Sequence, residues 1–333
     1  MSKPLATIYD VANRAGVSIS TVSRVLNSPG KVQEQTRKAV LTAMDELSFI
    51  PKAEAIARAR KYLYRIGVIT PFLTEASFVQ RIRGISDYLN PSQFELIIYT
   101  VKTNEQLSEY LDMLSVGGRL DGLIVLSILL PEEQRVRLKR SGIPVVFVEV
   151  AYDEFSAVAI DNVRGGQVAA EFLLSKGYTQ FGFLGEYSSM SFALAATEQR
   201  LQGFRETLKR AGISLEERFV RTAEMSKDLG ERWISDLLLN PDRPQVLFAS
   251  SDILGAKIMK IASKHGLKVP EDIGILAFDD LDMAEFLHLT TVSQSLDASG
   301  RLAAELLEKK ISRRDEPRRK ILLDLSVVDR GSC

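Results

Sequence analysis

The sequence predicts an α/β protein in two parts. A small N-terminal unit of three helices contains a helix-turn-helix, and a larger core forms two lobes with doubly wound parallel sheets. Residues 7–47 carry apolar side chains at helical spacing. From Arg65 onward, short apolar segments alternate with amphipathic helical segments, which is the rhythm of βαβ units. The 333 residues exceed one ordinary domain, and the stretch after Arg65 is long enough for two sheets.

The first two predicted helices enclose a tight turn. Thr7 is a good N-cap, because its hydroxyl accepts hydrogen bonds from the free amides of the first turn. Gly16 supplies the positive φ that ends the first helix, and Ser18 caps a second helix over residues 19–26. The apolar faces of the two helices consist of Ile8, Val11, Ala12, Ala15, Val22, Val25 and Leu26.

The other face of the second helix is polar. It presents Ser20, Thr21, Ser23, Arg24 and Asn27, which are short hydrogen-bonding side chains and one guanidinium. Such groups read base edges and phosphates when a helix enters the major groove of DNA. The alternative is an ordinary pair of packed helices with a solvated polar face.

A third helix is predicted over residues 33–47, where an apolar stripe closes a small core over the first two helices. Pro51 ends this unit. The next segment, KAEAIARARKYLYR, has little apolar surface to bury by itself. We therefore expect a headpiece at residues 1–50, a hinge segment at 51–64 and a core at 65–333.

The core pattern predicts individual elements. Strands are expected at residues 66–70, 94–100, 122–126, 145–150, 181–184, 246–249 and 273–278. Helices are expected at residues 78–89, 106–114, 132–139, 166–176, 200–211, 229–239 and 254–265, with a last helix at 296–310 and a final strand near 321–328. The charged run 312–320 is expected to be a solvated loop. Because parallel α/β sheets bind ligands at the carboxyl ends of their strands, a cleft between two such lobes is the expected binding site.

Charge is balanced overall but unevenly distributed. The chain has 43 basic and 43 acidic residues, yet residues 1–61 hold ten Lys and Arg against five acids. A basic head on an acidic body is typical of a protein that binds duplex DNA through the head alone. The alternative is chance segregation of charge in a short segment.

Several classes are excluded. No apolar run is long enough for a membrane span, and no secretory signal is expected at the N-terminus. Cys333 is the only cysteine, so no intrachain disulfide forms, which fits a cytoplasmic protein. With two histidines and one cysteine, a transition-metal site is not expected. The P-loop, nucleophile-elbow, zincin and dinucleotide-binding motifs are absent, so we expect neither an enzyme nor a cofactor.

The headpiece matches a known family in fixed register. The matching residues are Thr7, Tyr9, Asp10, Val11, Ala12, Ala15, Gly16, Val17, Ser18, Thr21, Val22, Ser23, Arg24, Val25, Asn27, Thr36, Arg37, Val40, Ala43, Met44, Leu47, Ile50 and Pro51. With these residues the segment resembles the DNA-binding headpiece of the lac repressor family (LacI/GalR).

The core continues the resemblance. Its matching segments are Ile66-Gly67-Val68, Arg83-Gly84-Ile85, Asp121 to Ile124, Ile143-Pro144-Val145, Asp161-Asn162, Gly165-Gly166, Arg200-Leu201, Gly203-Phe204, Asp252, Val269-Pro270 and Phe278-Asp279-Asp280. The resemblance implies a periplasmic-binding-protein-like core in which the chain crosses between the lobes three times. It implies an N-lobe at about 65–160 and 292–320, and a C-lobe at about 161–291 and 321–333 that the final strand completes.

The resemblance also implies which residues contact DNA. In the headpiece they are Thr7, Tyr9, Ser18, Ile19, Ser20, Thr21, Ser23, Arg24 and Asn27, and in the hinge segment they are Ala55 and Arg58. Ile19 can meet a thymine methyl group. The family inserts a hinge leucine into the minor groove to kink the duplex, and Arg58 stands at that position here. An arginine can read a narrow minor groove but is a poor wedge, and the alternative is that Arg58 contacts phosphates only.

The effector-binding positions carried over are Phe78, Glu149, Arg200, Met225, Ser251 and Asp279. The resemblance makes Phe78 a cover for a sugar or ring face, Arg200 a fork for hydroxyls or a carboxylate, and Glu149 and Asp279 hydroxyl acceptors. As alternatives, Phe78 and Met225 are plain core residues, and Arg200 and Asp279 are partners in a salt bridge between the lobes. Leu194 stands where purine-type relatives carry an arginine, which disfavours a nucleobase or phosphate.

The sequence therefore predicts a sequence-specific DNA-binding regulator, and a repressor in particular. A small sugar-like effector between the lobes would control its affinity for a pseudopalindromic double-stranded operator, which a homodimer would bind. The alternatives are an activator, or a ligand-binding protein or enzyme that keeps the headpiece without using it.

Overall fold

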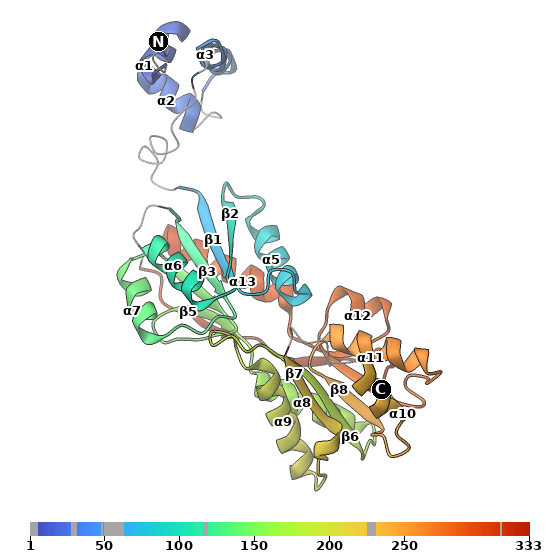
Figure 1. Cartoon of the computed structure of the whole chain (residues 1–333). Coiled ribbons are helices and arrows are strands. Elements are labelled where there is room, and N and C mark those ends of the chain that lie inside the picture. Colours follow the sequence, from blue (N-terminus) through green and yellow to red (C-terminus); the bar gives the residue numbers. More distant parts are fainter. Residues whose placement is uncertain are drawn as a thin grey trace. The chain divides into compact units, whose positions relative to one another are not determined.

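The computed structural model describes residues 6–27, 32–47, 49, 63–115, 119–224, 231–313 and 315–333. The chain divides into two compact units, Met1–Leu63 and Tyr64–Cys333 (Figure 1). Among the described residues, no helix combines the length and the apolar character needed to cross a membrane.

The N-terminal unit contains α1 (Ile8–Ala15), α2 (Ile19–Asn27) and α3 (Glu34–Glu46). Thr7 forms a capping box: its hydroxyl accepts from the Asp10 amide (3.4 Å), and the Asp10 carboxylate accepts from the Thr7 amide (2.8 Å). Gly16 ends α1 in the left-handed region (φ 66°), as the sequence predicts. The buried core of the unit consists of Val11, Ala12, Val22, Val25, Val40 and Ala43.

The N-lobe of the core is a parallel sheet in the strand order β11-β5-β4-β3-β1-β2. These strands are β1 (Arg65–Thr70), β2 (Glu95–Thr100), β3 (Gly122–Leu126), β4 (Val145–Val148), β5 (Ser156–Ala159) and β11 (Lys320–Leu322). Its helices are α5 (Ala76–Leu89), α6 (Asn104–Ser115), α7 (Glu132–Arg140) and α13 (Leu296–Ser312). Leucines of α6 and α7 pack on one face of the sheet, and α13 packs on β3, β4 and β5.

The C-lobe sheet has the strand order β12-β10-β9-β8-β6-β7. These strands are β6 (Phe181–Tyr187), β7 (Val220–Glu224), β8 (Val246–Ala249), β9 (Gly274–Asp279), β10 (Thr290–Ser293) and β12 (Ser326–Val328), and β12 runs antiparallel to β10. Its helices are α8 (Asn162–Ser175), α9 (Ala196–Arg210), α10 (Glu231–Leu239), α11 (Asp252–Lys264) and α12 (Asp282–Phe286), with a 3₁₀ turn at Glu217–Phe219. Phenylalanines 181, 183, 204, 248 and 278 belong to the core that α8 and α9 form with the sheet.

The prediction of a single final strand near residues 321–328 is wrong, because the structure has two short strands there in different sheets. Lys320–Leu322 pairs with β5 in the N-lobe, whereas Ser326–Val328 pairs with β10 in the C-lobe. The intervening residues carry the chain between the two sheets, so one continuous strand is impossible. Residues 321 and 322 therefore belong to the N-lobe sheet rather than the C-lobe, and residues 292 and 293 belong to the C-lobe sheet rather than the N-lobe.

The other predicted core strands and helices are present, with ends that shift by a few residues. The sequence prediction missed β5, β7, β10 and α12. These elements are short, and β5 (SAVA), β7 (VRTAE) and β10 (TTVS) lack the long apolar runs that identify buried strands.

Two glycines let α8 and α9 pack backbone against backbone. A Cβ added at Gly166 would lie 1.9 Å from the Arg200 carbonyl oxygen, and a Cβ at Gly203 would lie 1.8 Å from that of Val163. Since real Cβ atoms do not approach backbone oxygens so closely, only glycine fits at both positions. This close packing holds α9, and therefore Arg200, against the C-lobe sheet.

We predict that Gly166→Ala destabilises the core by about 2–3 kcal/mol, because the clash is with backbone and no rotamer change relieves it. The clash outweighs the gain of about 1 kcal/mol that alanine brings to a helix interior. Urea unfolding followed by circular dichroism measures the effect. Glu171→Ala on the exposed face of α8 is the control and should change stability by less than about 0.5 kcal/mol. An unchanged midpoint for Gly166→Ala would contradict this packing.

Candidate functional site

The residues predicted to contact DNA gather on α2 and on the start of α1. Tyr9 and Ile19 are large hydrophobic residues, yet they are 64% and 42% exposed, so both side chains are accessible to a partner. Thr7, Ser18, Ser20 and Arg24 are exposed, whereas Thr21 and Ser23 are half-buried. The Ser18 hydroxyl is hydrogen-bonded to the hydroxyls of Ser20 and Thr21, each at 2.8 Å. Asn27 ends α2, and its side chain is not described. The predicted hinge contacts Ala55 and Arg58 lie outside the described residues, as does the predicted effector residue Met225.

A pocket lies in the core where the carboxyl ends of strands from both sheets meet, which is the expected place for a ligand in α/β lobes. Its N-lobe side includes Phe72, Glu75, Phe78, Arg81, Ser127 and Glu149, and its C-lobe side includes Glu186, Thr197, Arg200, Ser250, Ser251 and Asp279. Gln294, on the crossing between β10 and α13, also lines the pocket.

Three of the lining residues at strand ends have strained backbones. Ser127 after β3, Glu149 after β4 and Asp279 at the end of β9 have φ values of 53°, 69° and 123°. Non-glycine residues adopt such values at a cost in free energy, and they cluster at functional sites. All three residues lie at or directly after the end of a strand, and their side chains line the pocket.

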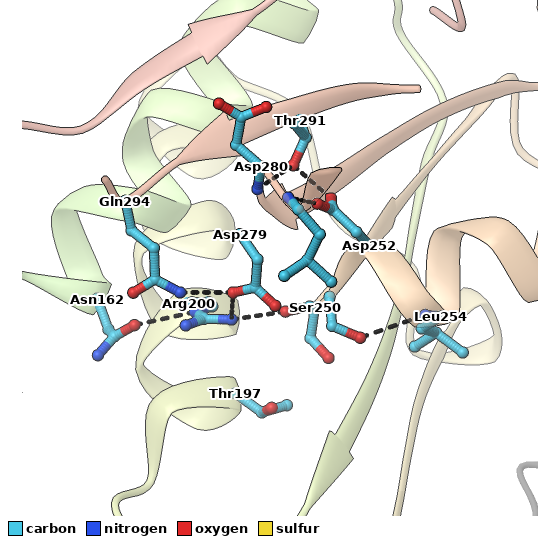
Figure 2. Close-up of polar contacts among 12 residues, drawn as sticks. Asn162, Thr197, Arg200, Ser250, Asp252, Leu254, Asp279, Asp280, Thr291 and Gln294 are labelled. Atoms are coloured by element: carbon cyan, nitrogen blue, oxygen red, sulfur yellow. Dashed lines mark hydrogen bonds and ion pairs between the residues drawn. The ribbon is translucent and has the colours of Figure 1, made fainter. Parts of the chain in front are cut away.

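Arg200 is buried, and its Nε and Nη1 have partners in the C-lobe (Figure 2). Its Nε donates to Asn162 Oδ1 (2.9 Å), and its Nη1 donates to the Ser250 carbonyl oxygen (2.6 Å). The same Nη1 lies 3.7 Å from Asp279 Oδ1, and the guanidinium carbon lies 3.6 Å from the centre of the Phe278 ring. Arg200 therefore ties together α8, α9, β9 and the residue that follows β8.

A second buried arginine, which the sequence analysis missed, reaches the same pocket from α5. Arg81 Nη2 donates to Glu149 Oε1 (2.6 Å) and to Gln294 Oε1 (2.8 Å). Gln294 Nε2 in turn donates to Asp279 Oδ1 (2.5 Å). Arg81 stands three residues after Phe78, so the helical period alone places both on one face of α5. The signal in the sequence was an arginine on the same helical face as Phe78, a residue that was expected to contact the effector.

The predicted effector residues have different surroundings. Phe78 is buried, lines the pocket and meets Phe72 edge-on at 5.6 Å. Glu149 also lines it, but its carboxylate already accepts hydrogen bonds from Arg81 and from the Ser127 hydroxyl. Ser251 lines the pocket while its hydroxyl accepts from the Leu254 amide (3.2 Å) and caps α11.

Arg200 and Asp279 do not form a salt bridge between the lobes, which was the alternative interpretation. Both residues belong to the C-lobe, in α9 and β9, and their ion pair stays within it. Polar contacts between the lobes run instead through Arg81 and Gln294 in the pocket, and through the exposed ion pair of Arg83 in α5 with Asp282 in α12. Asp280 diverges from its neighbour, because its carboxylate accepts from Arg330 (2.7 Å).

The segment after β6 also connects the lobes. Phe192 is buried in the N-lobe core, and its carbonyl oxygen accepts from the Leu129 amide (2.8 Å). Ala193 forms an isolated antiparallel bridge with Ile128. This segment places Leu194 in the pocket wall.

Two carboxylates near Arg200 are electrostatically perturbed. Burial raises the pKa of Asp279, and Arg200 and Arg81 oppose that rise. Burial also raises the pKa of Asp252, which accepts hydrogen bonds from the Leu281 amide (2.6 Å) and the Thr291 hydroxyl. Asp252 thereby fixes the loop after Asp279 (Figure 2). The described part of the chain contains no group of three His, Cys, Asp or Glu side chains that could hold a metal ion.

Comparison with known proteins identifies the family. Residues 7–52 match "Bacterial regulatory proteins, lacI family", and residues 170–333 match "Periplasmic binding protein-like domain". The chain is 32% identical to the HTH-type transcriptional repressor PurR of Vibrio vulnificus over 98% of both chains. The chain belongs to the lacI family of bacterial regulatory proteins.

Solved structures of this family share the complete fold. The lac repressor dimer bound to operator and the anti-inducer ONPF is 25% identical, with a TM-score of 0.79 over 99% of both chains. The complex of the transcriptional regulator CelR with cellobiose is 26% identical, with a TM-score of 0.69 over 98% of this chain and all of that one. As a lacI-family member, the chain is a DNA-binding transcriptional regulator with a periplasmic-binding-protein-like core.

We predict that Arg200→Met destabilises the core by about 3–5 kcal/mol at pH 8, because it leaves the Asp279 carboxylate buried without its cation. The loss should be smaller at pH 5.5. Without Arg200 the pKa of Asp279 rises further above 3.8, so the folded variant takes up a proton there and avoids burying the charge.

Urea unfolding of both proteins at the two pH values measures this difference. Arg205→Met is the control. Arg205 is in α9, as Arg200 is, but it forms a more exposed ion pair with Glu217 of the 3₁₀ turn. A destabilisation by Arg200→Met that is equal at pH 5.5 and pH 8 would refute the electrostatic explanation.

Proposed function

We propose that this chain is a transcriptional repressor whose affinity for an operator is set by a small sugar-like effector in the pocket between the core lobes. The observation that carries the proposal is the buried polar chain from Arg81 through Gln294 to Asp279 and Arg200. A ligand that touches these groups contacts both lobes at once, so its binding free energy depends on how the lobes are arranged.

A sugar fits the lining of the pocket. Hydroxyl groups both donate and accept hydrogen bonds, as the buried arginines and carboxylates require. Phe78 offers an apolar ring against which a sugar face can pack. The related regulator CelR has been solved in complex with cellobiose, which supports this ligand class.

Coupling to DNA follows from the connectivity. The segment 51–64 leads from the headpiece into β1 of the N-lobe. An effector that changes the relation between the lobes moves the start of β1 in each protomer of a dimer, and with it the headpiece attachment. Thermodynamic linkage makes this coupling reciprocal. The factor by which the effector changes the affinity for the operator equals the factor by which the operator changes the affinity for the effector. The core then acts as a sensor and not as an enzyme.

We assign DNA recognition to the exposed face of α2, with Ile19, Ser20 and Arg24 at base edges and Thr7, Tyr9, Ser18, Thr21, Ser23 and Asn27 supporting them at bases and phosphates. In the hinge segment we assign minor-groove or phosphate contacts to Ala55 and Arg58. Because the target is chromosomal DNA, we assign the protein to the bacterial cytoplasm.

Duplex binding tests the proposal. A duplex selected from a randomised library by the wild-type protein should bind with a log affinity that falls steeply with log salt. Arg24→Ala should weaken binding about tenfold or more. Arg14→Ala is the matched control and should change binding less than about twofold, because Arg14 is already paired with Glu46 at 2.6 Å. Salt-insensitive or absent binding would favour a ligand-binding protein that does not use its headpiece.

We also propose that two copies of the chain pair through α12 and bind a pseudopalindromic operator. Phe286 of α12 is 82% exposed, which is unusual for a phenylalanine, and Leu287 beside it is also exposed. A second copy is the occupant we assign to this surface, in keeping with the lac repressor dimer. Two-fold symmetry would then place two recognition helices in successive major grooves.

Phe286→Glu should convert a dimer to a monomer at micromolar concentration, because a charge at the centre of an interface cannot be buried unpaired. Sedimentation velocity measures the mass. Leu239→Glu, at another exposed apolar residue of the C-lobe, should leave the dimer intact. A wild-type monomer, or a dimer that survives Phe286→Glu, would contradict the assignment.

A further inference from the structure

Arg81 has a buried donor that the described chain does not satisfy. The side chain is almost completely buried, with 2% of the residue exposed, and it lines the pocket. Its Nη2 is used by Glu149 and Gln294, but its Nε finds no acceptor. Because nearly all buried N–H groups in proteins are hydrogen-bonded, an acceptor supplied by a ligand is the expected partner.

The carboxylates of the pocket are unequally available. Both oxygens of Glu149 already accept, one from Arg81 and the other from the Ser127 hydroxyl. Asp279 uses Oδ1 for Gln294 and Arg200, and its Oδ2 makes no hydrogen bond within the described residues. A ligand can therefore donate to Asp279, whereas Glu149 serves to hold Arg81 in place.

The described lining is also negative overall. Glu186 takes part in a further interaction and is left out of the sum. The other charged groups are the carboxylates of Glu75, Glu149 and Asp279 and the guanidiniums of Arg81 and Arg200, which leaves one negative charge in excess at neutral pH. An anionic ligand would be repelled in a site where partial burial strengthens the interaction, and a cation would be attracted.

We infer that the pocket selects an uncharged or positively charged sugar over a sugar acid or sugar phosphate because of its net charge, and that Arg81 adds to the affinity by donating from Nε to an acceptor oxygen of the ligand. The inference rests on the proposed function, because it concerns the effector of the same pocket. It adds a binding residue from α5 and a charge rule for the effector.

The two parts of the inference can be separated by paired substitutions. Arg81→Met alone would leave Glu149 buried without its cation and make the pocket more negative. Arg81→Met/Glu149→Gln removes the N–H donor and keeps the net charge of the lining unchanged. The matched control is Arg164→Met/Glu171→Gln, which removes an exposed arginine–glutamate pair on α8.

The experiment is isothermal titration calorimetry at pH 7 with defined probes. These are D-glucose, D-glucosamine, D-glucuronate and glucose 6-phosphate, the corresponding galactose series, cellobiose, D-ribose and ribose 5-phosphate. For each neutral sugar that binds, the acid and the phosphate should bind about tenfold more weakly or worse, and the amine at least as tightly.

In the Arg81→Met/Glu149→Gln variant, neutral sugars should lose about tenfold in affinity while the ranking by charge stays the same, since only the donor is lost. The control pair should bind as the wild type does. Circular dichroism and the unfolding midpoint confirm that each variant is folded, and loss of ligand affinity in a folded variant is a readout that a purely structural role would not give.

Three outcomes would overturn the inference. If an acid or phosphate binds more tightly than its neutral parent, the charge rule is wrong and the proposed function stands. If the Arg81→Met/Glu149→Gln variant binds neutral sugars as the wild type does, the role of Arg81 is wrong. If no probe of any charge binds, the sugar-effector function itself fails and the inference fails with it.

Discussion

The burial of Arg200 constrains much of the C-lobe. A guanidinium stays charged in proteins, so a buried arginine must be surrounded by acceptors and by a carboxylate. The Asn162 side chain, the Ser250 carbonyl and the Asp279 carboxylate meet this need, and the Phe278 ring covers one face. These groups come from separate elements, so the charge can be accommodated only when those elements are in place together.

The same constraint reaches the N-lobe through Asp279. This carboxylate accepts from Gln294, and the other end of Gln294 accepts from Arg81 on α5. Close helix packing at glycines makes this geometry possible in both lobes. Gly166 and Gly203 bring α8 and α9 together, and Gly84 and Gly300 do the same for α5 and α13, where an added Cβ would lie 2.0 Å from a backbone oxygen. The helices that carry the two arginines are therefore held close to their partners.

The sequence predicted the helix-turn-helix and the parallel sheets because each leaves a local signal, whereas the pocket residues came from the resemblance to the lac repressor family. Thr7 and Gly16 mark the ends of α1, and apolar runs mark the central strands. It failed where the determining contact is distant in the chain. The split between β11 and β12 depends on which sheet each three-residue segment pairs with, and three residues carry no periodicity. Arg81 was missed because its partners, Glu149 and Gln294, are 68 and 213 residues away.

The central claim is that the pocket and the operator are energetically coupled, and fluorescence anisotropy of a labelled operator duplex tests it most directly. The affinity for the duplex would be measured with and without a saturating sugar that binds the core. The account predicts a change of about fivefold or more in either direction, and an equal change in sugar affinity when the duplex is added. Equal duplex affinities with the sugar bound and absent would contradict it.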